Sequence, residues 1–267
     1  MRKMLLLLVI LPLTGCITGS KTVEHSFIGY NKAVCQNQRQ QLLLNLVRMR
    51  YRETPCFLKT SSLNVGYSQS MSIGGNHATP ATRVRTWGFN FSANTSEKPT
   101  VTYSPVEGKE FQEKMLKKFD PKSFMSLVEA GWPLEMLISV MVKDGIPDGL
   151  DASKVKIVKI VDGQVKLDDK AIQMQSLNDV FFEMAKGVQV PDSHVKFTKE
   201  YESKPAFKVV TDLTLHRYVA VRHRGTLFCI DDTDIKSKDY FALLNTLYNM
   251  VVNEESNSKP LLLINSN

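Results

Sequence analysis

The sequence has no apolar stretch long enough to cross a membrane as a helix. The longest run near the N-terminus, Met4 to Leu11, has eight residues and ends at Pro12. A helix rises about 1.5 Å per residue, whereas the hydrocarbon core of a bilayer is about 30 Å thick. A short apolar run after Arg2 and Lys3 is instead typical of a secretory signal peptide.

The sequence also has few residues that bind transition metals. It contains four cysteines with no CxxC pair, and its five histidines are scattered. These spacings exclude the usual structural zinc sites, and we expect no metal and no cofactor. Cys35 and Cys56 flank a predicted helix, which would hold them too far apart for a disulfide, while a bond that involves Cys229 stays open.

Motifs of the common catalytic classes are missing as well. The chain has no G-x-S-x-G nucleophile motif, no HExxH and no glycine-rich phosphate-binding loop. A non-enzymatic role is therefore the favoured interpretation.

The residues directly after the apolar run carry a more specific signal. Leu13, Thr14, Gly15 and Cys16 resemble the lipobox of bacterial lipoproteins, in which a leucine and two small residues precede a cysteine. The resemblance implies a lipid on the Cys16 sulfur, with palmitate as a usual acyl chain, and cleavage by the signal peptidase before Cys16. Ile17 stands where an aspartate often retains such proteins in the inner membrane. In a Gram-negative host the resemblance thus implies the outer membrane, facing the periplasm.

Composition is that of a folded globular protein. Apolar residues make up 43% and charged residues 23% of the chain. The net charge is +7, and +5 without Arg2 and Lys3. This modest excess favours anionic surfaces without selecting one of them.

Periodicity predicts helices and strands in alternating blocks. Helices are expected over residues 35–55, from an N-cap at Ser104 onward, from Asp120-Pro121 to 131, over 133–145, over 176–187 and from Ser237 to Val251; strands are expected at 63–67, 83–91, 99–105, 154–168, 206–212, 217–232 and 260–264. Tight turns at Asp162-Gly163 and Arg224-Gly225 indicate antiparallel pairing. The fold class expected is α+β, with a mainly antiparallel sheet and several helices packed on it.

We divide the chain into a signal peptide (1–15), a tether from the lipidated Cys16 (16–30) and one α+β domain (31–267). The first three strands are expected to form an antiparallel meander. Trp87, Phe89 and Phe91 share one face of it, and a core face is favoured over a stacking platform.

Two groups of residues are candidates for a site. Asp231, Asp232 and Asp234 lie within four residues and have the oxygen ligands that hard cations prefer. They lack the glycine and glutamate of an EF-hand loop, so helix capping and pairing with Lys236 and Lys238 is favoured. His223 with Asp231 or Asp232 is a second candidate, as an acid/base pair.

Four segments, QQLLLNLVRMRY, VTYSPVEGKEF, FFEMAKGVQVP and LFCIDDTDIKSKDYFALL, resemble a group of uncharacterised bacterial, often lipid-anchored, envelope proteins. This resemblance lends no catalytic residue. The leading hypothesis is a lipid-anchored, periplasm-facing accessory, scaffold or binding subunit. It contacts the membrane through its lipid, has envelope protein partners and binds no nucleic acid. One alternative is a lipid-anchored hydrolase that uses His223 and the loop with Asp231, Asp232 and Asp234, which we call the acidic loop. A module that binds an anionic polymer is the other. The oligomeric state stays open.

Overall fold

The computed structural model describes residues 15–78, 86–143, 151–155, 157–198, 207–211, 216–253 and 263–266. The chain divides into two compact units. One comprises Met1–Phe57 and Glu107–Glu254, and the other comprises Leu58–Val106 and Glu255–Asn267. The prediction that residues 31–267 unfold as one cooperative domain stays a prediction.

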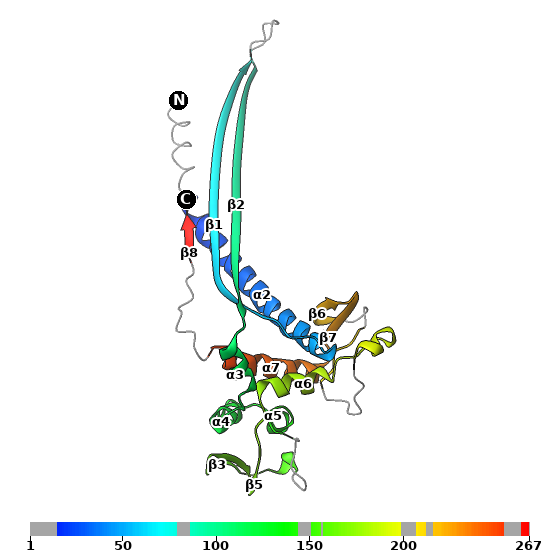
Figure 1. Cartoon of the computed structure of the whole chain (residues 1–267). Helices are drawn as coiled ribbons and strands as arrows, with labels where there is room; N and C mark the ends of the chain where they lie inside the picture. Colours follow the sequence, from blue (N-terminus) through cyan, green and yellow to red (C-terminus); the bar gives the residue numbers. More distant parts are fainter. Residues whose placement is uncertain are drawn as a thin grey trace. The chain divides into compact units, whose positions relative to one another are not determined.

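The first unit combines helices with short antiparallel sheets, so the predicted α+β class is confirmed. Its elements are α2 (Gly15–Arg50), α3 (Lys109–Leu116), α4 (Pro121–Glu129), α5 (Leu134–Met141), η2 (Ala152–Lys154), β3 (Val158–Val161), β4 (Gln164–Leu167), β5 (Lys170–Ala171), α6 (Leu177–Ala185), η3 (Asp192–Phe197), β6 (Arg217–His223), β7 (Thr226–Asp231) and α7 (Ile235–Asn253). Strands β3, β4 and β5 form one sheet in that order, and β6 and β7 form another (Figure 1).

Helix α2 carries much of the core of this unit. Leu42, Leu43, Leu46 and Val47 recur at helical spacing and are fully buried, where the helix packs against β6 and α6. The helix predicted here is confirmed, but it begins earlier than expected. Because α2 starts at Gly15, the segment expected to be a tether (16–30) is the first part of the same helix.

An aromatic cluster joins the other helices to this core. Phe57 is stacked on Tyr248 of α7 at a centroid distance of 5.0 Å, and it meets Phe111 of α3 and Phe181 of α6 edge-on. Aromatic pairs in these orientations add about 0.5–1.5 kcal/mol each to the effect of burial. Burial also raises the pKa of the Tyr248 phenol.

Polar side chains cap the starts of two helices of the first unit. The Asp120 side chain accepts a hydrogen bond from Ser123 N at the start of α4, and Ser176 forms a reciprocal capping box with Asp179 at α6. Both predicted turns have the left-handed backbone that a two-residue hairpin needs: φ is 51° and 73° at Asp162 and Gly163, and 47° and 81° at Arg224 and Gly225.

The cap predicted at Ser104 is wrong. Residues 104–106 belong to a strand that continues to Val106, and Gly108 precedes α3 instead. The Ser104 hydroxyl is hydrogen-bonded to Ser61 on the neighbouring strand. Pairing between strands therefore overrides the local capping signal.

The second unit consists of β1 (Phe57–Ala78), β2 (Thr86–Val106) and β8 (Leu263–Ser266), in the order β2-β1-β8. Figure 1 shows β1 and β2 as a long antiparallel ribbon. Strand β8 pairs with β1 in parallel, from Asn64 with Leu263 to Tyr67 with Ser266. The predicted three-stranded meander is thus wrong, because residues 99–105 continue β2 and β8 is the third strand. The prediction for Trp87, Phe89 and Phe91 lies outside the described side chains.

None of the described helices combines the length and the hydrophobicity that crossing a membrane requires.

Candidate functional site

A polar cluster that joins residues distant in the sequence lies where α2 ends, in the first unit. Tyr51 and Glu53 come directly after the helix, His223 and Arg224 come from the β6–β7 turn, and His194 lies in η3. We call these five residues the α2-end cluster.

The end of α2 has a left-handed backbone at a residue that does not favour it. Arg52 N donates to Met49 O and Glu53 N donates to Arg48 O, which closes the last turn of the helix. This arrangement requires a left-handed residue, and glycine usually occupies it. Here it is Arg52, with φ of 61°. The strained position directs the chain so that Glu53 reaches the β6–β7 turn.

Glu53 is the centre of the cluster. Its Oε1 accepts hydrogen bonds from Arg224 Nε at 3.0 Å and Nη2 at 2.7 Å. Its Oε2 lies 3.2 Å from His223 Nε2, in the geometry of an ion pair rather than an aligned hydrogen bond. Burial raises the pKa of Glu53, but the hydrogen bonds from Arg224 and the charges of His223 and Arg224 outweigh burial, so the pKa is lowered overall.

Aromatic rings surround this ion pair. The Arg224 guanidinium lies 5.3 Å from the centroid of Tyr51 and 4.9 Å from that of Phe197. The Tyr51 hydroxyl is 2.7 Å from His194 Nδ1. Burial raises the pKa of Tyr51, with smaller opposing effects of Arg224 and Arg50. Every charged group in the cluster therefore has a partner, and the arrangement holds three chain segments together.

The predicted pair of His223 with Asp231 or Asp232 is not formed. In the β6–β7 register His223 lies opposite Thr226 beside the turn, whereas Asp231 lies opposite Arg217 at the other end. Strands rise about 3.3 Å per residue, so the two ends are about 20 Å apart. The partner of His223 is Glu53, which is remote in sequence and carries no local signal for this role.

Each of the three carboxylates of the acidic loop binds a group of the same chain. Asp234 accepts from Ser237 N at 3.0 Å and from the Ser237 hydroxyl at 2.7 Å, which caps α7. Asp231 accepts from Thr233 N, and Asp232 pairs with Lys238 Nζ at 2.8 Å. Burial raises the pKa of Asp234, but the Ser237 hydrogen bonds lower it overall. Capping and the pairing with Lys238, both favoured from the sequence, describe this loop, whereas Lys236 enters as a nearby charge that lowers the pKa of Asp234.

Metal ligands do not converge elsewhere in the described part of the chain. No group of three or more His, Cys, Asp or Glu residues among those residues is placed to hold a metal ion. Among the described residues, Cys35, Cys56 and Cys229 form no disulfide bond, and Cys229 is buried.

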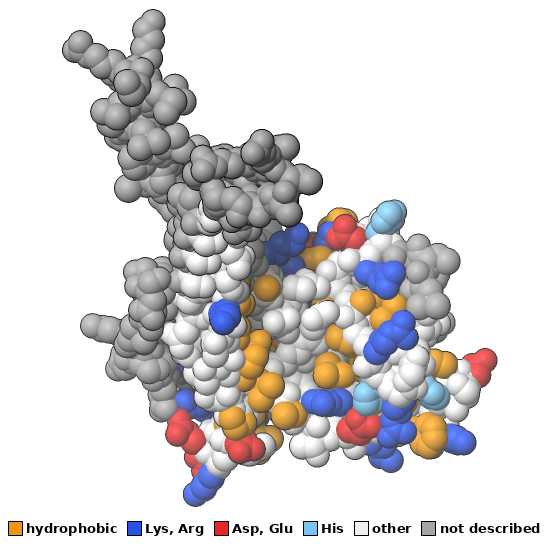
Figure 2. Space-filling model, turned by 90° about the horizontal axis from the view of Figure 1, so that it is seen from above, with side chains coloured by type: hydrophobic (Ala, Val, Ile, Leu, Met, Phe, Trp, Pro, Cys, Tyr) orange, Lys and Arg blue, Asp and Glu red, His pale blue; other side chains and the backbone are white. Residues whose placement is uncertain are grey.

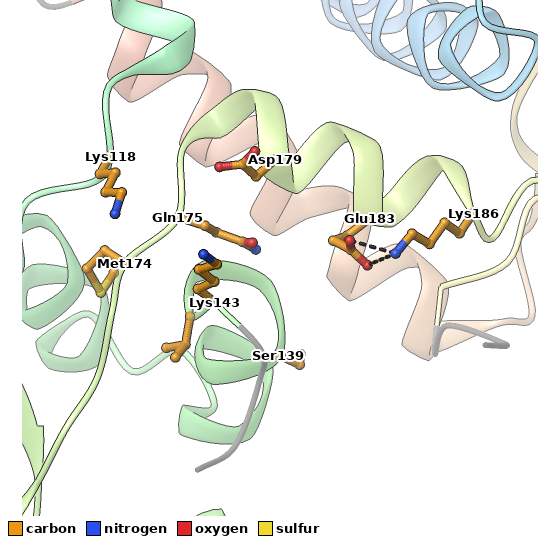
Figure 3. A pocket seen from close by; sticks show the side chains of 9 residues that line it. Lys118, Ser139, Lys143, Met174, Gln175, Asp179, Glu183 and Lys186 are labelled. Carbon is orange, nitrogen blue, oxygen red and sulfur yellow. Dashed lines mark hydrogen bonds and ion pairs between the residues drawn. The ribbon is translucent and has the colours of Figure 1, made fainter. Parts of the chain in front are cut away.

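Two cavities border these helices. One of about 460 Å³ lies beside Glu53 and is lined by Met49, Arg52, Glu53, Thr54, Pro55, Asn178 and Phe182. The other, of about 620 Å³, is lined by polar residues of α5, α6 and the strand-like segment before α6 (Figure 3). There Glu183 binds Lys186 at 2.6 Å and Asp179 caps α6, while Lys118 and Lys143 point into the space. Both lysines are exposed, so this cavity offers weak attraction for anions.

The distribution of positive charge over the surface also bears on the binding of anions. On the face that Figure 2 shows, the lysine and arginine side chains of the described residues are scattered among acidic and apolar ones. A protein that binds an anionic polymer concentrates its positive charge on one face, and this view shows no such concentration among them.

Comparisons with known proteins give no relative: no protein-family model, curated protein or solved structure matches this chain.

Replacement of Arg52 by glycine tests the strained end of α2. Arg52→Gly should raise the free energy of unfolding by about 1 kcal/mol relative to Arg52→Ala, because alanine keeps the left-handed strain and glycine removes it. Urea denaturation measures the difference, and both variants lack the guanidinium. A glycine variant less stable than the alanine variant would contradict the assignment.

Replacement of Glu53 tests the ion pair. Glu53→Gln should lower the free energy of unfolding by about 1 kcal/mol at neutral pH, a value that allows for partial exposure. Because folding lowers the pKa of Glu53 below its ordinary value of 4.5, its contribution is present above that value and is lost as the pH falls through the folded pKa. The difference from wild type should therefore shrink in acid. Glu129→Gln, at an exposed position, is the matched control, and equal behaviour of the two variants would refute the role of Glu53.

The acidic loop gives a third expectation. Calcium or magnesium at millimolar concentration should leave the melting temperature unchanged relative to sodium chloride of equal ionic strength, because the carboxylates already have partners. Asp234→Ala should cost about 1 kcal/mol as a lost cap, and the exposed Asp239→Ala much less. A saturable calcium-dependent rise that disappears in Asp231→Asn would establish a cation site instead.

Proposed function

We propose that this protein is a lipid-anchored, periplasm-facing envelope protein that serves as a non-enzymatic accessory, scaffold or binding subunit. The observation that carries the proposal is the sequence Leu13-Thr14-Gly15-Cys16 directly at the start of a continuous helix. A thiol at that position is the acceptor for the lipid, and two or more acyl chains give stable anchoring.

Helix α2 would connect the lipid attachment site to the folded core. It continues from Gly15 to Arg50 without interruption, so the 26 residues from Cys16 to the buried Leu42 rise about 40 Å. Phe27 and Ile28 on its exposed part are 59% and 62% exposed. A lipid on Cys16 would thus be joined to the folded core by a continuous helix. The exposed side chains of Phe27 and Ile28 suit contact with a membrane or a protein partner.

The geometry of the candidate sites supports a non-enzymatic role. The carboxylates of the acidic loop cap a helix or pair with lysine, and His223 contacts Glu53 instead of an aspartate. The hydrolase hypothesis required these groups to act together on a substrate. With Ile17 after Cys16, the outer membrane of a Gram-negative host is the proposed location, and envelope proteins are the proposed partners.

Replacement of Cys16 tests the anchor. Cys16→Ser should abolish incorporation of labelled palmitate and leave an uncleaved or soluble chain, because serine cannot form the thioether. Cys35→Ser, at an exposed cysteine on the same helix, is the matched control and should be labelled like wild type. Palmitate that still enters the Cys16→Ser chain, or wild type found entirely outside the membrane fraction, would overturn the proposal.

A further inference from the structure

The β1–β2 ribbon is much longer than ordinary strands. Strand β1 has 22 residues and β2 has 21, whereas strands in globular proteins usually have about 3–10. At about 3.3 Å per residue, each spans about 70 Å. A two-stranded ribbon is marginally stable in water, and a third strand or a packed layer is normally needed.

Over more than half of this length, the described residues supply no third strand. Strand β8 covers β1 only from Asn64 to Tyr67. Beyond it, residues 68–78 of β1 have only β2 beside them, and residues 86–96 of β2 have only β1, among the described strands. We call these two stretches the open edges.

The open edges lack the usual devices that prevent strands from pairing with other chains. Natural edges are protected by charged residues, proline or a covering segment. Neither open edge contains Asp, Glu, Lys, Arg or Pro. Among the described side chains there, Ser68, Ser70, Ser72, Asn90, Ser92 and Asn94 are polar and exposed, and Ser96 is partly exposed.

Such devices are present nearer the base of the ribbon, and they stop where the open edges begin. Strand β8 covers β1 at Asn64–Tyr67. At the same level β2 carries Glu97, Lys98 and Pro99, since the Cβ position of Gly66 approaches Lys98 O to 3.8 Å. Both edges are thus protected at one level and unprotected beyond it, which indicates that the outer part pairs with another strand.

We propose that the open edges pair with those of further copies of this chain, with β2 of one copy beside β1 of the next. The two edges are equal in length and both uncharged, so the ribbon complements itself. Copies related by a rotation keep their β1 strands in the same direction, so β2 of one meets β1 of the next antiparallel, as inside the hairpin. This contact is heterologous and repeats until the ring closes, which leaves no open edge. The inference does not depend on the lipid or on the proposed function.

Charge placed on the open edges tests this pairing. The full-length chain in neutral detergent should show by light scattering several copies of the 30.2 kDa chain. Ser70→Lys with Ser72→Lys, or Asn90→Lys with Ser92→Lys, should weaken assembly at least about tenfold, because lysines on an edge strand are a device by which natural sheets avoid pairing with another strand. Gln112→Lys with Gln164→Lys adds the same charge at exposed positions of the first unit and should leave assembly unchanged. A wild-type chain that is monomeric at every concentration overturns the proposal, as does equal weakening by all three pairs.

Cross-linking tests the arrangement without adding charge. One chain carries Ser72→Cys and another Ser92→Cys, both with Cys35→Ser and Cys56→Ser, and a chain without an engineered cysteine is the control. A short bismaleimide should join cysteine 72 of one copy to cysteine 92 of the other in the mixture. Links between two cysteines at 92, in particles of two copies, would overturn the heterologous arrangement. The absence of any link above the control would overturn pairing itself.

Discussion

Each backbone N–H and C=O group needs a hydrogen-bond partner, and this requirement accounts for much of what the polar residues do in this protein. In the first unit the partners lie within the chain. Side chains of Asp120, Ser176 and Asp234 accept from the first amides of α4 and α6 and from Ser237 N near the start of α7. Val210 exchanges two hydrogen bonds with Cys229 at 2.8 Å, which covers one edge of β7. In the second unit the backbone groups between β1 and β2 pair with each other, while those on the outer edges of the ribbon point away from it.

Because of this requirement, polar residues that the sequence suggests as binding or catalytic groups have structural roles instead. Three aspartates within four residues indicate a cation site when only their spacing is known. In the structure one caps a helix, one closes a turn and one binds a lysine. Likewise the Glu53 carboxylate, between Arg224 and His223, connects the end of α2 to the β6–β7 turn. These charged groups position segments of the chain relative to one another.

The parts of the fold that could be predicted depend on local signals. The buried stripe of α2 follows from apolar spacing, and the turns at Asp162-Gly163 and Arg224-Gly225 follow from residue types that tolerate a left-handed backbone. The prediction of a cap at Ser104 was wrong because pairing with the strand that contains Ser61, 43 positions away, outweighs the local preference of serine for a helix start. The contact of Glu53 with Arg224 joins residues 171 positions apart, so no pattern in the sequence could reveal it. The length of β2 was hidden by Glu97, Lys98 and Pro99, which indicate a turn by composition, whereas proline is tolerated on an edge strand.

Hydrogen exchange of the ribbon amides is the measurement that tests most directly whether this protein works by assembly. In an isolated antiparallel hairpin about half of the amides point outward and exchange with water, whereas in a paired ribbon nearly all of them are hydrogen-bonded. Exchange should therefore be measured by mass spectrometry on the full-length chain, over peptides that cover residues 68–78 and 86–96, at increasing protein concentration. The account predicts that protection in both peptides rises together with assembly and extends beyond half of the amides. Protection that stays at half or less, whatever the concentration, would show that the edges remain open and would contradict the account.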